Sequence, residues 1–264
     1  MANVIAISNQ KGGVGKTTTC YSLGACLVEM GQKVLVVDLD PQSNLTLAAG
    51  LDFEELEITL VDVIDNTLGK EADLENVIHP TSLPGLDILP SDPRMARVER
   101  DLYEYDNYEG MLTKALAHWV GNYDYLLLDC PPTLSSITLV ALSTAHEVLI
   151  PVTCEYYAAK GLDLLLRIIS SVENHTGHSL PWSMVITMFD PRNKISNTVY
   201  EQLNNNFSKN LLKSMIRMDT RLREAPVFGE PIITYSPTTR ASLEYRELAR
   251  EFHERTLARS GTHE

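Results

Sequence analysis

Residues Gln10–Thr18 read Gln-Lys-Gly-Gly-Val-Gly-Lys-Thr-Thr, and this stretch decides the fold. It follows the apolar segment Val4–Ile7, which is typical of a buried strand, and it opens a helical pattern that runs from Thr18 to Met30. In a turn of this kind the backbone N–H groups point inward, and the helix N-terminus adds a positive partial charge. The sequence therefore predicts a cradle for phosphate groups between the first strand and the first helix.

Particular side chains of this turn have expected roles. Lys16 is expected to reach the β and γ phosphates of a nucleotide, and the Thr17 hydroxyl is expected to bind Mg²⁺. The turn departs from the common pattern G-x-x-x-x-G-K-[ST], because Gln10 stands where the first glycine belongs, and it gains a second lysine, Lys11. We expect the nucleotide to contact Lys11, Gly12, Gly13, Val14, Gly15, Lys16, Thr17 and Thr18.

Length and composition indicate a globular chain with a full core. The 264 residues are 44% hydrophobic and 22% charged, which favours a single α/β domain over residues 1–264. No apolar run approaches the ~18 residues of a membrane span, and no secretory segment opens the sequence, so we expect a cytoplasmic protein. Four cysteines without C-x-x-C spacing indicate reduced thiols rather than disulfides, a zinc site or an iron–sulfur cluster.

Charge is unevenly distributed along the chain. The net charge of −13 argues against a uniformly basic nucleic-acid binder. Residues 52–109 hold sixteen acidic and four basic side chains, whereas residues 189–250 hold ten basic and seven acidic ones. The last third of the chain is therefore the candidate for contacts with an anionic partner, although both stretches could also be ordinary solvated surfaces.

Strand and helix patterns alternate, which predicts an α/β fold with a mostly parallel, doubly wound sheet and helices on both faces. The expected strands are Val4–Ile7, Lys33–Asp38, Gly85–Pro90, Tyr125–Asp129, 147–152, Ser183–Met188 and 213–218. The expected helices are 18–30, 92–104, 108–120, 134–144, 158–175, 196–208 and 240–257. Residues 51–80 are acidic and loosely helical, and residues 221–239 form a turn-rich connection.

Three carboxylates end apolar strands. Asp38 and Asp40 follow one strand and Asp129 ends another, at the edge where open α/β sheets bind ligands. We expect Asp129 to bind Mg²⁺ through a metal-bound water, together with Thr17. Asp40 is expected to position the attacking water in phosphoryl transfer. Asp38 has two open roles, in the magnesium shell or in a hydrogen bond that fixes the loop.

Seven segments together resemble the ParA/MinD family of deviant P-loop ATPases, and within it the short chromosomal-type ParA proteins called Soj. They are K-G-G-V-G-K-T-T (11–18), V-V-D-L-D-P-Q (36–42), D-C-P-P (129–132), C-E-Y-Y-A-A-K-G (154–161), T-M-F-D-P-R (187–192), R-L-R-E-A-P (221–226) and G-E-P-I-I-T-Y (229–235). The resemblance covers essentially the whole chain and implies the deviant P-loop NTPase fold. Since the first strand starts near Asn3, we expect no N-terminal helix-turn-helix extension.

This resemblance implies ATP and Mg²⁺ as cofactors and a homodimer that sandwiches two ATP molecules. Lys11 would cross to the phosphates of the partner and act in catalysis there with Lys16. Gly12 would let two backbones approach closely. Asp40 matches the hydrolytic aspartate of the family.

The resemblance also implies DNA binding without sequence preference, and hence association with the nucleoid. The family's two main DNA-binding arginines correspond to Arg192 and Arg221, and nearby candidates are Lys194, Arg217, Arg223 and Arg240. Contacts of this kind are made to phosphates and weaken with salt. The expected protein partner is ParB-like, with a basic N-terminal tail that the acidic middle segment could receive.

One segment departs from the family pattern. Relatives read I-P-R-N where this chain has Ile216-Arg217-Met218-Asp219, close to the nucleotide base. Met188 and Arg217 are the expected base contacts.

Two other activities share this P-loop class. A MinD-like membrane ATPase needs a basic amphipathic C-terminal helix. Residues 244–259 place Leu248, Phe252 and Leu257 on one side among alternating charges, so we expect the helix to pack on its own domain, without stable membrane association. A biosynthetic enzyme of the cobyrinic acid amidation type would need an amidotransferase domain or a substrate pocket. The motifs leave the cargo open among chromosome, plasmid, protein microcompartment and chemoreceptor cluster.

Overall fold

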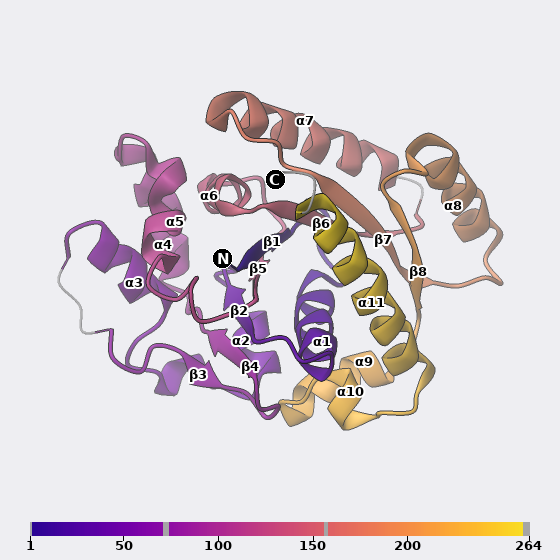
Figure 1. Ribbon diagram of the computed structural model, residues 1–264, viewed down its shortest axis with the longest axis horizontal. Helices are drawn as coiled ribbons and strands as arrows, with labels where there is room; N and C mark the ends of the chain where they lie inside the picture. The colour runs from indigo at the N-terminus through magenta and orange to yellow at the C-terminus, as the bar shows by residue number, and fades with distance from the viewer. Residues whose placement is uncertain (1, 71–73, 156–157, 261–264) are drawn as a thin grey trace.

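The computed structural model describes residues 2–70, 74–155 and 158–260, and its framework is one eight-stranded sheet (Figure 1). The strand order is β3-β4-β2-β5-β1-β6-β7-β8. The strands are β1 (Asn3–Ile7), β2 (Val34–Asp38), β3 (His79–Pro80), β4 (Leu86–Leu89), β5 (Tyr125–Asp129), β6 (Glu147–Thr153), β7 (Trp182–Phe189) and β8 (Leu211–Arg217). All pairings are parallel except the β3–β4 pair at one edge.

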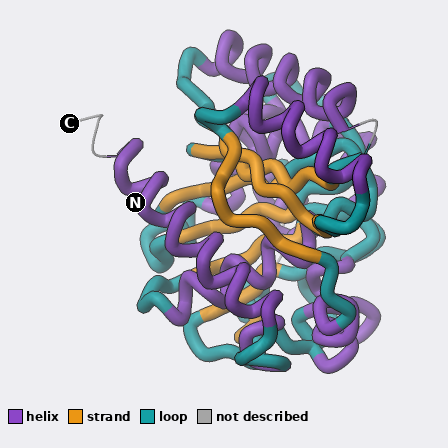
Figure 2. The backbone as a smooth tube through the Cα atoms, turned by 90° about the vertical axis from the view of Figure 1, so that its right-hand side faces the viewer, coloured by secondary structure: helices purple, strands orange, loops and turns teal. Residues whose placement is uncertain are grey.

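Helices cover both faces of the sheet (Figure 2). They are α1 (Lys16–Glu29), α2 (Asn44–Ala48), α3 (Leu60–Thr67), α4 (Met95–Asp101), α5 (Met111–Leu116), α6 (Ser136–Thr144), α7 (Ala158–Thr176), α8 (Lys194–Phe207), α9 (Arg221–Glu224), α10 (Ile232–Tyr235) and α11 (Arg240–Ser260). Short 3-10 turns are η1 (Phe53–Glu55), η2 (Leu102–Glu104), η3 (Tyr108–Gly110) and η4 (Ala225–Phe228).

The expected α/β fold, with its order of strands and longer helices, is confirmed. Of the helix expected at 108–120, only the 3-10 turn η3 and the six-residue α5 form. Three further features differ from the sequence prediction. The short helix α2 and the edge strand β3 were not expected, and the connection 221–239 contains α9, η4 and α10 rather than turns alone. These elements span two to five residues, which is too short to show a period.

Alternate residues of each central strand enter different cores. In β1, Val4 and Ala6 pack on the face covered by α3 to α8, whereas Ile5 and Ile7 pack on the face covered by α1 and α11. This is the two-residue period of a strand that is buried on both sides. It explains why the strand sequences are almost continuously apolar, and it holds their polar ends at one edge of the sheet.

Helix α11 packs against α1 and the edge strand β8. Glu251 accepts the backbone N–H groups of Lys213 and Ser214, both at 2.7 Å, and Glu244 accepts that of Arg217 at 2.8 Å. These carboxylates occupy donors that an edge strand would otherwise expose.

The prediction that α11 packs on its own domain is confirmed. The prediction that Leu257 belongs to its apolar stripe was wrong. Leu248 and Phe252 are buried, whereas Leu257 is 53% exposed. The buried stripe continues at Thr256, four residues after Phe252, as the helical period requires. No helix in the described part of the chain is both long enough and apolar enough to span a bilayer.

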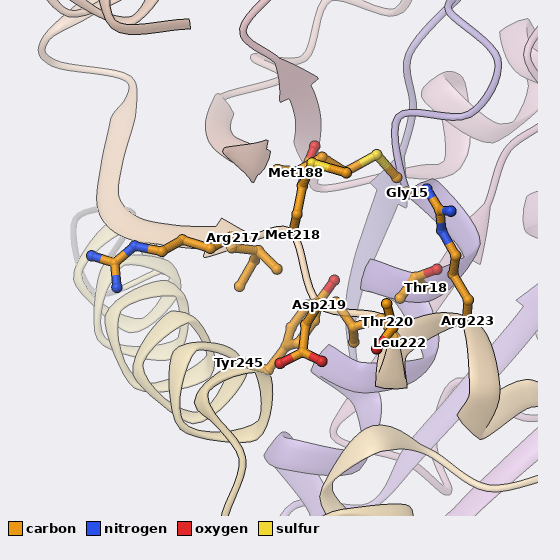
Figure 3. Close-up of a pocket in the computed structure, with 12 residues that line it drawn as sticks. Gly15, Thr18, Met188, Arg217, Met218, Asp219, Thr220, Leu222, Arg223 and Tyr245 are labelled. Atoms are coloured by element: carbon orange, nitrogen blue, oxygen red, sulfur yellow. The ribbon is translucent and has the colours of Figure 1, made fainter. Parts of the chain in front are cut away.

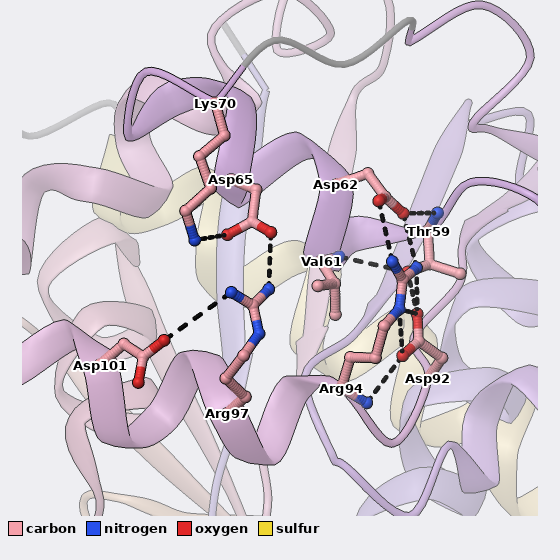
Figure 4. Close-up of polar contacts among 9 residues, drawn as sticks. All are labelled: Thr59, Val61, Asp62, Asp65, Lys70, Asp92, Arg94, Arg97 and Asp101. Atoms are coloured by element: carbon pink, nitrogen blue, oxygen red, sulfur yellow. Dashed lines mark hydrogen bonds and ion pairs between the residues drawn. The ribbon is translucent and has the colours of Figure 1, made fainter.

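The acidic middle segment is partly neutralised within itself (Figure 4). Arg94 forms ion pairs with Asp62 at 2.7 Å and Asp92 at 2.8 Å, and so joins α3 to the start of α4. Arg97 pairs with Asp65 at 2.6 Å in the same way. Basic side chains within the segment therefore join its helices.

Two glycines bring distant segments into backbone contact. Gly229 follows η4 and adopts φ +67°, and Gly50 follows α2. A Cβ at Gly229 would lie 2.8 Å from the Gly50 Cα, closer than carbon atoms normally approach. The loop that follows Asp38 is thereby packed against the segment that carries α9.

We expect Gly229→Ala to lower the free energy of unfolding by about 2–4 kcal/mol, because the added Cβ meets backbone and the left-handed conformation is costly for alanine. Urea unfolding followed by circular dichroism measures the loss. Gly121→Ala is the matched control, since that exposed glycine has open space around it. Equal unfolding midpoints for the two variants would contradict this account of the contact.

We expect Arg94→Gln to destabilise the fold by about 1–2 kcal/mol at pH 7, since Asp92 loses an ion-pair partner that is itself half exposed. Burial alone would raise the pKa of Asp92, but Arg94 and Thr59 bring this pKa below its usual 3.8. The stabilisation is therefore present above that value and is lost as the pH falls through the lowered folded pKa.

The gap in stability between wild type and Arg94→Gln should accordingly narrow below about pH 4, which thermal unfolding across pH measures. Arg100→Gln on the same helix is the control, because no ion pair of Arg100 occurs among the described residues. A gap that is independent of pH would count against the role of Asp92.

Candidate functional site

The turn between β1 and α1 forms the expected cradle. Gly13 and Gly15 adopt φ +72° and +84°, which glycine reaches without strain, and the backbone thereby curls over the start of α1. Lys16 is the first residue of this helix and is only 7% exposed. Its Nζ donates to the Lys11 carbonyl at 3.3 Å, across the turn. The ammonium is thus held inside the loop that the sequence predicted.

Charge is concentrated beneath this loop. Burial lowers the pKa of Lys16, while the nearby carboxylates of Asp129 and Asp40 act in the opposite direction. Asp129 ends β5 and is paired in register with Ile7 of β1 and with Asp38 of β2. The sheet therefore brings Asp38 and Asp129 together at the carboxyl ends of its parallel strands, as the sequence predicted.

Asp129 is the least satisfied polar group of the site. Its side chain is 1% exposed, and neither carboxylate oxygen has a hydrogen-bond partner among the described residues. Burial and Asp38 raise its pKa well above the usual value, and Thr17 and Lys16 oppose that rise. A buried carboxylate without a partner is costly, and a hard cation with oxygen ligands would relieve that cost. Asp129 and the Thr17 hydroxyl fit Mg²⁺.

Asp38 holds its own loop. Its Oδ2 accepts hydrogen bonds from the Thr46 backbone at 2.9 Å and the Thr46 hydroxyl at 2.8 Å, and its Oδ1 accepts the Asp40 N–H at 3.1 Å. Burial raises the pKa of Asp38 to about 6, against these hydrogen bonds. The contacts favour the loop-fixing role for Asp38, and its magnesium role stays a prediction.

A second cavity adjoins the cradle (Figure 3). It holds about 160 Å³ and lies between the P-loop and the segments that follow β7 and β8. Its walls are mostly apolar, and they include Met188, Ile216, Met218, Leu222 and Tyr245. An apolar slot beside a phosphate cradle suits a nucleotide base.

Met188 lines the cavity, as the expected base contact requires. The hydroxyl of Thr187, just before it, donates to the Val14 carbonyl at 2.8 Å and ties β7 to the P-loop. Arg217 also borders the cavity, but its guanidinium points away, and it lies 3.5 Å from Glu244 (Figure 3). Only the remainder of Arg217 is therefore placed to contact a base.

Sequence reasoning missed other residues of this cavity. Leu222 of α9 lies inside the R-L-R-E-A-P segment, which was considered only for its arginines, and no motif points to Tyr245 of α11. Met218 and Asp219 belong to the segment that departs from the family pattern, which was the available signal. Arg223 extends along the cavity toward Gly15, although it was expected at a DNA surface (Figure 3).

Comparisons with known proteins agree with this geometry. A family model described as an AAA domain matches residues 2–182. The sporulation initiation inhibitor protein Soj of Bacillus subtilis (strain 168) is 40% identical over 252 residues, which cover 95% of this chain and 98% of that protein. The chain belongs to the ParA/Soj family of P-loop ATPases. The chromosome partitioning protein ParA of Myxococcus xanthus (strain DK1622) is 37% identical, over 98% of this chain and 91% of its own length.

A solved structure shares the family fold. Cobyrinic acid a,c-diamide synthase from Mycobacterium smegmatis, with bound ADP and magnesium, superposes with a TM-score of 0.80. It is 33% identical, over 95% of this chain and 93% of that chain. The ParA-type resemblance is confirmed, and the relatives named Soj and ParA favour it over the MinD-like alternative.

The side chain of Lys11, which the resemblance predicts to cross to a partner, contacts residues of its own subunit in this structure. Its Nζ donates to the Thr153 hydroxyl at 3.2 Å and forms an ion pair with Glu155, which follows β6. The side chain is 37% exposed, so it stands at the surface beside the cradle. Tyr156 and Tyr157, which follow Glu155 in the C-E-Y-Y-A-A-K-G segment, lie outside the described residues.

The six cations expected to bind DNA differ in their neighbours. Arg192 is paired with Asp190, and Arg217 and Arg240 share Glu244. Arg240 also donates to the Met218 carbonyl at 2.8 Å, so the start of α11 lies at the end of β8. Within the described ranges, no ion pair holds the remaining three, which are Lys194, Arg221 and Arg223.

We expect Asp129→Asn to leave the nucleotide-free protein as stable as wild type or more stable, because it removes a buried carboxylate whose oxygens have no hydrogen-bond partner among the described residues. The same variant should lose the Mg²⁺-dependent part of the stabilisation by ATP, which in wild type is about 2.7 kcal/mol at 100 times Kd. Thermal unfolding with ATP, in the presence of Mg²⁺ or a chelator, measures both effects.

Asp163→Asn is the control for Asp129→Asn, because Asp163 is an exposed carboxylate on α7. A nucleotide-free Asp129→Asn protein that unfolds far below wild type, or one that keeps the full Mg²⁺ effect, would contradict the assignment.

Proposed function

We propose that this ParA-family chain is a Mg²⁺-dependent ATPase that dimerises on ATP, binds DNA without sequence preference and positions a chromosome, a plasmid or another cargo. The observation that carries the proposal is the unpartnered, buried Asp129 carboxylate beside Thr17 and Lys16, at the end of β5. The relatives named Soj and ParA, and the ADP and magnesium in the cobyrinic acid a,c-diamide synthase structure, support the same reading. The whole chain would act as one ATPase domain.

The proposed chemistry uses the residues of the cradle. Lys16 and the loop amides hold the phosphates, and Thr17 and Asp129 hold Mg²⁺, which neutralises charge on the phosphate oxygens when bound. Asp40 orients water for attack on the terminal phosphate. Its Oδ1 accepts the Gln42 N–H at 2.9 Å, and no bond to its Oδ2 occurs among the described residues.

The proposed dimer places the two cradles face to face, with each Lys11 at the phosphates of the partner. Gly12 and Gly13 are exposed, and a Cβ added to either would meet nothing within 4 Å. A second backbone can therefore approach this turn. A cation supplied by the partner would make pairing depend on the terminal phosphate.

The proposed DNA surface lies on the segments that follow β7 and β8. Arg221 on α9 is exposed, Arg223 is exposed at the rim of the cavity, and Arg192 is exposed although paired. An exposed ion pair is weak, so a DNA phosphate can replace Asp190 as the partner of Arg192. Two copies of the surface in a dimer would strengthen a grip that is weak in one subunit, and they would hold the protein on the nucleoid.

The proposed protein partner is ParB-like and presents a basic tail. The acidic side chains around η1 are exposed and have no ion pair among the described residues, in contrast to Asp62 and Asp65. They are Asp52, Glu54, Glu55 and Glu57. These residues follow α2 in the chain, and the loop before α2 carries Asp40.

The test is DNA binding with ATP and with ADP, combined with measurement of the oligomeric state. We expect wild type to bind DNA as a dimer with ATP alone, and Asp40→Ala to remain trapped in that state. Lys11→Ala should stay monomeric and bind no DNA. Arg221→Ala should dimerise normally, but bind DNA more weakly and with a smaller salt slope, by about 0.9 per lost phosphate contact.

Arg167→Ala is the control for Arg221→Ala, since Arg167 is exposed on α7 outside the proposed surface. Equal DNA binding with ATP and ADP would contradict the proposal that the nucleotide controls DNA binding. Dimerisation of Lys11→Ala would show that Lys11 is not needed for pairing. The basic tail of a ParB-like partner should stimulate hydrolysis in the presence of DNA.

A further inference from the structure

Lys11 is held by two groups of its own chain. The Nζ atom donates to the Thr153 hydroxyl at 3.2 Å and forms a hydrogen-bonded ion pair with the Glu155 carboxylate. Thr153 is nearly buried at the end of β6, whereas Glu155 is 64% exposed. The amino group is therefore directed along the surface of its own subunit.

The backbone around these side chains is fixed by neighbouring strands. β1 and β6 pair in parallel, with Ile7 opposite Leu149. The Asn9 side chain then bridges the two segments, since its Oδ1 accepts the Lys11 N–H at 3.0 Å and its Nδ2 donates to the Pro151 carbonyl at 2.7 Å. The sheet thus sets Lys11 and the end of β6 side by side, whatever the state of the ion pair.

The turn after β6 brings Glu155 to the lysine. The Glu155 N–H donates to the Thr153 carbonyl at 2.9 Å, which folds the chain back directly after the strand. Both partners of Lys11 come from this one turn. The other lysine of the P-loop, Lys16, does not contact this turn, because its amino group points into the cradle.

We propose that Glu155 is a positioning residue for Lys11, which it holds on its own subunit in the absence of nucleotide and releases when the subunits pair. The consequence for dimerisation rests on the proposed function, in which Lys11 crosses to the partner. An amino group bonded to Glu155 cannot at the same time contact phosphates in another subunit. The Lys11–Glu155 pair therefore opposes dimerisation. It raises the concentration of ATP-bound protein at which subunits begin to pair.

The expected size of this effect is modest. Both side chains reach solvent, so water and salt screen the pair, and exposed pairs of this kind change an equilibrium by about two- to fivefold. Such a factor does not block dimerisation. It shifts the protein concentration at which subunits pair, and the terminal phosphate then offers Lys11 a stronger partner.

The test reads Lys11 directly in the nucleotide-free protein. An acetylating N-hydroxysuccinimide ester is added, and mass spectrometry follows the modification of Lys11 relative to Lys194, an exposed lysine on α8. In Glu155→Gln we expect Lys11 to react about two- to fivefold faster than in wild type, since the amine is no longer held in an ion pair. Glu155→Asp should restore part of the protection.

The control is Glu201→Gln, which makes the same change in charge on the exposed side of α8. A second arm measures dimerisation with ATP in an Asp40→Ala background, where we expect Glu155→Gln to lower the midpoint concentration by about two- to fivefold and Glu201→Gln to leave it unchanged.

Unchanged reactivity of Lys11 in Glu155→Gln overturns the proposal, whatever the second arm gives. Raised reactivity with an unmoved dimerisation midpoint also overturns it, because the contact would then not oppose pairing. Raised reactivity in a protein that forms no ATP-dependent dimer in any variant keeps the Glu155 contact and rejects the proposed function instead.

Discussion

A buried carboxylate without a hydrogen-bond partner is the constraint on which the site depends. Asp129 sits at the end of β5, between β1 and β2, and it is fixed there by the same apolar strands that build the core. A buried charge of this kind is tolerated only beside groups that compensate it. Lys16 stands beside it for this reason, and the Thr17 hydroxyl adds the oxygen that suits a hard cation.

The other loops of the site are braced against this centre. Asp38 holds the loop of Asp40 through Thr46, and that loop leads by way of α2 to the close contact between Gly50 and Gly229. Gly229 lies between α9 and α10 in the chain, and α9 contributes Leu222 and Arg223 to the lining of the cavity beside the cradle. The loop of Asp40 is therefore connected to the segment of α9 by packed backbone. Because close-packed segments resist independent movement, a shift of one is expected to affect the other.

Surface charges around the site differ in how firmly they are held. Arg94 and Arg97 are engaged with carboxylates that are partly buried, so they join α3 to α4. The Lys11–Glu155 and Arg192–Asp190 pairs are more exposed and exchange partners at low cost. The firmly held pairs maintain the fold, and the exposed ones suit the proposed contacts of Lys11 with a second subunit and of Arg192 with DNA.

The amino-acid sequence determined the P-loop, the order of the main strands and helices and the carboxylates at their ends, because apolar periods and glycine positions are local properties. The cavity lining by Leu222 and Tyr245, the hold of Asp38 on Thr46 and the pairing of Lys11 with Glu155 were decided only by the tertiary structure. The cavity lining and the Lys11–Glu155 pair join residues that are distant along the chain, so they depend on how strands pair. Asp38 and Thr46 are only eight residues apart, but their contact depends on how the loop after β2 folds back. Side-chain direction also had to be seen, as with Arg217, whose guanidinium points away from the cavity and lies 3.5 Å from Glu244 of α11.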